Sequence, residues 1–278
     1  MFIGSHAIAQ GLLTRHELRR RSYRRLVNGV YADPSIPVDH ALRCRAVALL
    51  LPVGTAIGGL SAAAFHGAPV AGPSAPVTVV RHPGVLWKGP REVRVHQATL
   101  AVADLERTDD VRITSALRTA WDVAALEPLG TAVAALDAMV RKGSVTQPQL
   151  AALVSAGAGR WGVVRVRRAV PLVDPSADSP QESRVRVALV LAGLAPRTQY
   201  AVVEDGEFLG KVDAAWPEQK VALEYDGVHH FEAAQIGLED VRYERLEAAG
   251  WAVIRVTAAD LADLDRFVER VRRVLASR

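Results

Sequence analysis

Residues 210–230 read GKVDAAWPEQKVALEYDGVHH, and this stretch decides the fold of the C-terminal part of the chain. Two alternating segments, 211–216 and 221–226, flank the polar sequence Pro-Glu-Gln-Lys at 217–220. That pattern predicts a β-hairpin with a four-residue connection. The connection fixes a register in which the facing pairs are Trp216 with Val221, Ala214 with Leu223 and Asp213 with Glu224.

Strand alternation then sorts the hairpin side chains onto two faces. A slip by one residue would mix apolar and charged groups, so the pattern supports the register. The first face is apolar and comprises Val212, Ala214, Trp216, Val221, Leu223 and Tyr225. The second face carries three carboxylates, one lysine and two small residues, namely Asp213, Glu224, Asp226, Lys211, Ala215 and Ala222.

The three acids on one face carry the first functional hypothesis. Directly opposed residues have Cβ atoms roughly 5 Å apart, and like charges at that distance repel. A hard divalent cation reverses the sign of the interaction, because one or two carboxylates together with waters and phosphate oxygens hold Mg²⁺. The alternative is that the acids are only solvated on an exposed face.

The flanking sequence predicts helix, three strands, helix, strand and helix. Ser179-Pro180-Gln181-Glu182 combines an N-cap serine, a proline at the first helical position and a glutamate at the third. The helix it opens runs to Gly193, and Gly250 fits the C-cap of a later helix. The remaining elements are expected as a strand at 197–205, a helix at 232–249, a strand at 251–257 and a closing helix at 260–275.

This order, with an acid on the second strand and Glu-x-Asp on the third, resembles the PD-(D/E)XK nuclease fold. VDAAWPEQKVALEYDGVHH followed by DVRYERLEAAGWAVIRVT is similar to the Vsr-like family, a module common in actinobacteria and related to very-short-patch-repair endonucleases. The similarity covers about a hundred residues. It implies an αβββαβ domain with a mixed central sheet.

The resemblance also implies roles for individual residues. Asp213 and Glu224 would be the metal-binding acids, with the backbone carbonyl of Tyr225 as a further ligand. Glu182 matches an acid that many such nucleases carry on the first helix, and it reads equally well as a capping-box glutamate. Asp240, Arg242 and Arg245 match family positions on the next helix, where surface ion pairing is the alternative.

Asp226 departs from the family pattern, which has lysine at this position. In the predicted register Lys211 lies opposite Asp226, and our hypothesis is that Lys211 partly replaces the missing cation. His229 and His230 follow the third strand, where a general base or a phosphate contact is expected, and ordinary loop residues are the alternative. The implied reaction is phosphodiester hydrolysis with Mg²⁺ or Mn²⁺ as cofactor.

The amino-acid composition agrees with a cytosolic protein that acts on nucleic acid. The chain has 278 residues, 50% of them hydrophobic, and a formal net charge of +4. The sequence pI near 9.5 favours an anionic partner such as nucleic acid. A single cysteine, Cys44, suits a reducing compartment and is expected as a core thiol. No targeting signal is evident, so we expect a cytoplasmic protein.

Residues 46–65 carry no charge and are long enough to be a candidate membrane span. Pro52, Gly54, Gly58 and Gly59 interrupt the stretch, which predicts a buried helix-turn-helix pair and no membrane segment.

The N-terminal region gives the second functional signal. Helices are expected at 3–10, from the capping-box sequence Thr14-Arg15-His16-Glu17, and at 22–27, followed by an extended wing at 29–34. A basic helix-turn-helix stretch of this kind suits contacts to DNA phosphates, and a solvated cationic surface is the alternative. The candidate DNA-binding residues are Arg15, Arg19, Arg20, Arg21, Arg24 and Arg25.

GLLTRHELRRRSYRRLVNGVYADP, with GGLSAAAFHGAP and ITSALRTAWDVAA downstream, resembles the AbiEi-type antitoxins of abortive-infection systems. The resemblance covers residues 1–153 and implies an N-terminal winged helix that binds operator DNA. Ser61, His66 and Asp122 match recurrent family positions. We read Ser61 as an N-cap and His66 as a helix-end residue, and assign no catalysis to the three.

The middle of the chain predicts a mixed α/β region, with strands at 77–80 and 92–96 and helices at 115–126, 129–141 and 146–153. The Gly- and Pro-containing stretch 155–180 holds the domain boundary, near residue 170. The sequence thus predicts an α/β (α+β) protein with a winged helix at 1–36, a mixed α/β domain at 37–170 and a nuclease-fold domain at 171–278.

Two function classes follow. The first is a metal-dependent DNA endonuclease with an N-terminal DNA-binding region. The second is a non-catalytic DNA-binding regulator of antitoxin type whose C-terminal domain keeps a nuclease fold. DNA is the expected partner in both, with a toxin-like or DNA-repair protein as a further one. The sequence predicts no oligomeric state.

Overall fold

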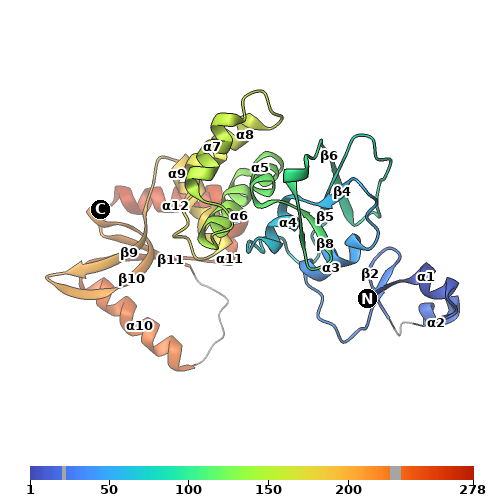
Figure 1. Ribbon diagram of the computed structural model, residues 1–278. Coiled ribbons are helices and arrows are strands. Elements are labelled where there is room, and N and C mark those ends of the chain that lie inside the picture. The colour runs from blue at the N-terminus through green and yellow to red at the C-terminus, as the bar shows by residue number, and fades with distance from the viewer. Residues whose placement is uncertain (21–22, 226–232) are drawn as a thin grey trace. The chain divides into compact units, whose positions relative to one another are not determined.

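A computed structural model describes residues 1–20, 23–225 and 233–278, and for residues 233–240 it describes the backbone alone. The fold is α/β, with helices interspersed among several sheets. The chain divides into two compact units (Figure 1). The first unit comprises Met1–Pro128 and Ala138–Pro171, and the second comprises Leu129–Asp137 and Leu172–Arg278.

The first unit begins with a small three-stranded sheet in the order β1-β3-β2, together with two short helices. Thr14 and Glu17 form the expected capping box at the start of α2. The bounds are β1 (Phe2–Ile3), α1 (Gly4–Ala9), α2 (Arg15–Arg19), β2 (Arg24–Val27) and β3 (Val30–Ala32).

The helix expected at 22–27 is wrong for Arg24–Val27, which is a strand. Asn28-Gly29 joins this strand to β3, and Val27 pairs with Val30 across the turn. Gly29 has φ +89°, a left-handed conformation that glycine adopts readily in tight turns. The Asn-Gly dipeptide between apolar residues is therefore the signal that the helical interpretation missed.

The first unit also contains a five-stranded mixed sheet in the order β6-β5-β4-β8-β7. Strands β5 and β6 run parallel, as do β4 and β8, while β4/β5 and β7/β8 are antiparallel. The bounds are β4 (Thr55–Ile57), β5 (Val77–Arg81), β6 (Val93–Gln97), β7 (Leu105–Thr108) and β8 (Val111–Thr114).

The helices that accompany this sheet agree with the expected ones at 115–126, 129–141 and 146–153. The helix-turn-helix pair expected within 46–65 is wrong, because the three-residue strand β4 separates α3 from α4. The bounds are α3 (His40–Ala48), α4 (Gly59–Phe65), η1 (Val102–Asp104), α5 (Ala116–Leu126), α6 (Leu129–Arg141), α7 (Gln147–Ala156), α8 (Val163–Ala169) and η2 (Val170–Leu172).

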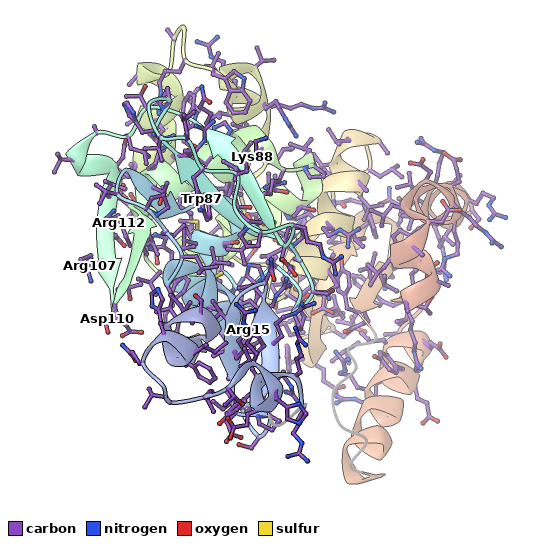
Figure 2. All side chains as sticks on the ribbon, turned by 90° about the vertical axis from the view of Figure 1, so that its right-hand side faces the viewer. Arg15, Trp87, Lys88, Arg107, Asp110 and Arg112 are labelled. Atoms are coloured by element: carbon purple, nitrogen blue, oxygen red, sulfur yellow. The ribbon has the colours of Figure 1, made fainter. Side chains whose placement is uncertain are left out.

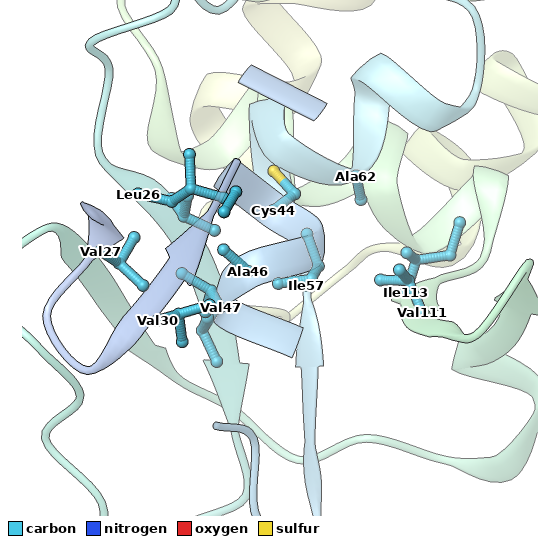
Figure 3. Close-up of a cluster of buried hydrophobic side chains, with 13 residues drawn as sticks. Leu26, Val27, Val30, Cys44, Ala46, Val47, Ile57, Ala62, Val111 and Ile113 are labelled. Carbon is cyan, nitrogen blue, oxygen red and sulfur yellow. The ribbon is translucent and has the colours of Figure 1, made fainter. Parts of the chain in front are cut away.

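One hydrophobic core joins the N-terminal sheet to the five-stranded sheet (Figure 3). Leu26 and Val30 of the N-terminal hairpin belong to the same buried cluster as Val47 of α3 and Ile57 of β4. Cys44 is fully buried in this cluster, as expected for a core thiol, and burial raises its pKa to about 12. The hairpin is thus packed as part of the first unit's core.

The second unit has the expected order of helix, three strands, helix and strand around a mixed sheet ordered β12-β11-β10-β9. Strands β11 and β12 are parallel, and the other pairs are antiparallel. The bounds are α9 (Pro180–Leu191), β9 (Arg197–Glu204), β10 (Glu207–Trp216), η3 (Pro217–Gln219), β11 (Val221–Tyr225), α10 (Ala233–Ala248), β12 (Ala252–Val256), α11 (Ala258–Ala262) and α12 (Leu264–Ala276).

The predicted hairpin register is confirmed, because Trp216 pairs with Val221 and Ala214 pairs with Leu223. Both faces of the sheet are covered. Ala214, Trp216 and Leu223 belong to the cluster that contains Phe267 of α12 and Val185 of α9. The opposite face carries a smaller cluster, which comprises Val202, Leu209, Val212, Ala215, Ala222, Leu246 and Trp251.

Two details of the second unit differ from expectation. Val212 packs with Ala215 instead of Ala214, next to a distortion of β9 at Gln199, which has φ +48°. The closing helix is divided into α11 and α12 at Asp263, whose carboxylate accepts the Arg266 backbone N–H and so caps the second helix.

Across the ranges given above, no helix combines the length and the apolar character that a bilayer crossing requires.

Candidate active site

Asp213 and Glu224 lie on neighbouring strands at the position that continues the register beyond the Ala214–Leu223 pair. Asp213 Oδ2 accepts the backbone N–H of Tyr225 at 2.9 Å. The charge of Asp213 also raises the pKa of Glu224, so the two carboxyl groups are close enough to interact. The sheet therefore brings the two principal predicted acids together.

Glu224 is the more buried acid of the pair, with 6% of its surface exposed. Burial is the main cause that raises its pKa to about 7, and the negative charge of Asp213 acts in the same direction. Arg242 of α10 opposes the shift, because its Nη1 lies 2.6 Å from Glu224 Oε1. Glu224 is thus a carboxyl group that ionises near neutral pH beside a fixed cation.

Glu182 is the third carboxylate, contributed by the first turn of α9. Its Oε2 accepts the backbone N–H of Asp178 at 2.8 Å and lies 3.4 Å from Gln199 Nε2. Ser179 caps the helix through the Glu182 N–H, but the reciprocal bond of a capping box is absent. Burial and the charge of Asp213 raise the pKa of Glu182, which places this acid within electrostatic reach of Asp213.

Tyr225 connects the helix that carries Glu182 to the strand that carries Glu224. Its hydroxyl donates to the Glu182 carbonyl at 3.3 Å, and burial raises the pKa of the phenol well above 10. The Tyr225 backbone N–H holds Asp213 at the same time. Tyr225 therefore holds the Asp213 carboxylate and links the backbone of Glu182 to the strand that carries Glu224.

The carboxylates of Asp213 and Glu224 are the candidate ligands for a divalent cation. Over residues 1–20, 23–225 and the described side chains beyond 240, no trio of His, Cys, Asp and Glu is arranged to hold a metal ion. The Asp213–Glu224 pair nevertheless fits Mg²⁺ or Mn²⁺, which accept one or two carboxylates and complete their shell with water and phosphate oxygens. A cation there would also remove the repulsion that raises the Glu224 pKa.

The role of Arg242 does not follow from the sequence alone. The resemblance to the Vsr-like family predicts that it belongs to the site, and ion pairing on the helix surface is the alternative. Its guanidinium reaches from α10 to Glu224 and also donates to the Lys211 carbonyl at 2.8 Å. Only tertiary structure reveals this pairing, because the two residues are eighteen positions apart on different elements.

The other predicted catalytic residues are not brought to the pair by any described contact. Lys211 is exposed on β10, where its partner on β9 is Ala201. Asp226, His229 and His230 lie outside the described residues, and the Lys211–Asp226 pairing therefore stays a prediction. Arg245 of α10 pairs at the surface with Glu207 of β10, an ion pair between two elements and not along the helix.

The described candidate DNA-binding arginines of the N-terminal region, Arg15, Arg19, Arg20, Arg24 and Arg25, are exposed, and Arg15 is labelled in Figure 2. Arg15 and Arg19 lie on α2, whereas Arg24 and Arg25 lie on strand β2. Arg24 also donates to the Ile36 carbonyl at 3.1 Å. Arg20 follows α2 as its C-cap, and Arg21 lies outside the described residues.

Ser61 and His66 have structural roles. The N-cap reading of Ser61 is wrong, because Gly58 occupies that position and Ser61 lies inside α4. The Ser61 hydroxyl accepts the Thr78 N–H at 2.8 Å and contacts His40 Nε2 at 2.9 Å. His66 is the C-cap of α4, as expected, and its Nε2 lies 2.9 Å from the Thr114 carbonyl.

The chain is 30% identical over 196 residues to two proteins described as uncharacterized, Rv2248 and MT2308, from the H37Rv and CDC 1551 strains of Mycobacterium tuberculosis. The match covers 69% of this chain and 72% of each relative. No family model and no solved structure matches the chain. This chain therefore belongs to the same family as these two uncharacterized mycobacterial proteins.

Proposed function

We propose that this protein is a metal-dependent endonuclease that hydrolyses phosphodiester bonds in DNA. One observation carries the proposal: Glu182, Asp213 and Glu224 come from three elements, and in a partly buried site the charge of Asp213 raises the pKa of each of the other two. Buried like charges are costly, and shifted carboxyl pKa values of this kind cluster at catalytic sites.

Asp213 and Glu224 would hold Mg²⁺ or Mn²⁺, with the Tyr225 carbonyl as an additional oxygen donor. Such a cation lowers the pKa of a bound water and neutralises charge on the phosphate. Tyr225 keeps Asp213 in place through its backbone N–H, and Asp178 orients Glu182 in the same way. Glu182, whose pKa burial raises, is a stronger base than an ordinary glutamate and is suited to take a proton from an attacking water.

Arg242 neutralises Glu224 in the structure as it stands. Once released from the carboxylate, its guanidinium lies beside the site with donors that suit a non-bridging phosphate oxygen. The exposed arginines of α2 and β2 would contact the DNA backbone and raise local DNA concentration.

A second candidate function is a DNA-binding regulator without catalysis, for which AbiEi-type antitoxins are the model. The Arg242–Glu224 ion pair favours it, because an arginine can replace a metal ion as the partner of a buried carboxylate. The lack of a metal-binding trio among the described side chains points the same way.

Cleavage of supercoiled, linear and mismatched DNA by the purified full-length protein with Mg²⁺ or Mn²⁺ distinguishes the two functions. Asp213→Asn and Glu224→Gln should each reduce the cleavage rate on the order of 10²-fold or more. Glu207→Gln is the matched control, because Glu207 is an exposed acid on the same strand as Asp213.

Metal binding provides a readout that does not depend on turnover. Calorimetric titration with Mn²⁺ should show a site that Asp213→Asn abolishes and Glu207→Gln keeps. Cleavage that survives both site variants would place the activity elsewhere. If the protein binds DNA but neither cuts it nor binds Mn²⁺, the regulator is the correct assignment.

A further inference from the structure

The first unit contains a pocket that neither resemblance explains. It has a volume of about 560 Å³, within the range of small-molecule sites. The end of edge strand β6, the helix α5 and the segment before α8 form its walls, and all of them belong to the first unit (Figure 1). Its lining combines two tryptophans, two arginines and a histidine with one buried carboxylate.

A buried ion pair makes the floor of the pocket rigid. Arg118 Nε lies 2.9 Å and 3.0 Å from the two carboxylate oxygens of Asp122, one helical turn further along α5. Arg118 Nη1 also donates to the Thr99 carbonyl and to Asp104. Asp122 is 1% exposed, and burial raises its pKa to about 6 against the effect of Arg118. These contacts tie the helix to the segment after β6.

Trp161 provides an aromatic platform at the rim. Its side chain is 61% exposed, an unusual exposure for so large an apolar group. The centroid of the His96 ring lies 4.9 Å from that of Trp161 at an interplanar angle of 36°, and burial lowers the His96 pKa and so favours the neutral imidazole. One part of the Trp161 ring therefore contacts His96, and the exposed remainder is available to stack on a planar ligand.

Arg160 supplies a cation beside the platform. Its guanidinium carbon lies 3.9 Å from the centroid of Trp121, and its charge lowers the pKa of Asp122. No carboxylate within the described chain forms a salt bridge with it. The stacked plane leaves the N–H groups at its edge able to donate to an anion.

Gln97, next to His96 on β6, is also among the residues that line the pocket, and Arg81 donates to its side-chain oxygen. A stacking surface and a cation suit a base and a phosphate, respectively.

We propose that this pocket binds a nucleotide, with the base stacked on Trp161 and its phosphate at Arg160. The nucleotide is either free or part of a single strand, since both present the same base and phosphate. This site is separate from the carboxylates of the second unit and does not depend on the proposed hydrolysis.

Calorimetric titration of the full-length protein with dAMP, deoxyadenosine and deoxyribose 5-phosphate tests the assignment. Binding should be saturable for dAMP and weaker for each fragment. Trp161→Ala should weaken binding of dAMP and deoxyadenosine on the order of tenfold, because base stacking contributes about 1–3 kcal/mol. Arg160→Ala should weaken binding of dAMP and leave deoxyadenosine unchanged.

Two controls separate the pocket from other sites. Arg167→Ala removes the same charge from an exposed position on α8 and should leave dAMP binding unchanged. Asp213→Asn should also bind dAMP as the wild type does, whatever its effect on cleavage. Trp161 and Arg160 are both exposed, and thermal denaturation checks that each variant keeps the fold.

A short oligodeoxyadenylate distinguishes the two sources of the ligand. Tighter binding of the strand than of dAMP, lost in Trp161→Ala, assigns a single strand, and equal binding assigns a free nucleotide. The proposal is overturned if dAMP does not bind at millimolar concentration, or if deoxyribose 5-phosphate binds as well as dAMP. Wild-type affinity in both Trp161→Ala and Arg160→Ala would overturn it as well.

Discussion

Neighbouring groups in the second unit have opposing effects on the pKa of Glu224. Burial and Asp213 favour its neutral form, whereas Arg242 favours its anion. Its ordinary pKa near 4.5 and its folded pKa of about 7 mean that the folded protein keeps a proton that the unfolded chain has already released. Stability is then linked to pH through this residue.

Between about pH 4.5 and 7, the folded state binds more protons than the unfolded state at Glu224, so its contribution to stability falls as pH rises. Glu224→Gln removes this dependence. Relative to the variant, the wild type should lose up to roughly 3 kcal/mol of unfolding free energy across that window. Chemical denaturation of both proteins at several pH values measures the difference, and parallel pH profiles would contradict the expectation.

Arg242→Met should leave Glu224 without its cation and destabilise the second unit by about 1–3 kcal/mol at neutral pH. The double variant Arg242→Met with Glu224→Gln should regain much of that loss, because it removes the unpaired carboxylate as well. Denaturation of the wild type, both single variants and the double variant completes the cycle. Additive effects would mean that the ion pair carries no coupling energy.

At the level of elements, the N-terminal hairpin depends on its Asn28-Gly29 turn. Gly29→Ala should cost about 1–2 kcal/mol, because φ +89° is unfavourable for a residue with a Cβ. An added Cβ at Gly29 meets nothing within 4 Å, so the loss reports backbone strain alone. Gly72→Ala is the control, since Gly72 is equally open and has no positive φ. Thermal denaturation compares them.

Much of the second unit's secondary structure followed from the sequence, because the Ser179 cap, the alternating strands and Gly250 mark their own boundaries. The three-residue strand β4 did not follow, since a short apolar run has too few residues to separate a strand from a buried helix. The hairpin register predicts that Asp213 and Glu224 lie opposite each other. It does not predict the ion pair of Arg242 with Glu224, because that pair is a tertiary contact between α10 and β11.

At the scale of the whole molecule, the candidate DNA-binding arginines and the candidate catalytic carboxylates belong to different units. The exposed arginines of α2 lie in the first unit, and the three carboxylates lie in the second. DNA affinity and cleavage should therefore respond to different substitutions.

Arg15→Ala combined with Arg19→Ala should weaken DNA binding and lower the salt dependence, because each lost phosphate contact reduces the slope of log K against log salt by about 0.9. Arg167→Ala combined with Arg168→Ala is the matched control, with equal loss of charge from another exposed surface. Binding titrations at several salt concentrations give the slopes. Equal weakening in both variants would mean that only net charge matters.

The reactivity of the Cys44 thiol measures whether the hydrophobic core of the first unit is intact. Its thiol is fully buried and its pKa is raised to about 12, so little reactive thiolate is present at pH 8. We expect no reaction with a thiol reagent in the native protein and complete reaction in denaturant. Fast labelling of the native protein would show that the core around the hairpin opens readily.

The buried position of the only cysteine also makes the chain well suited to distance measurements by labelling. A cysteine placed at an exposed residue in each unit would be modified while Cys44 stayed protected, and no core side chain would have to be replaced first. Spin or fluorescent labels could then follow the separation of the two units with and without DNA.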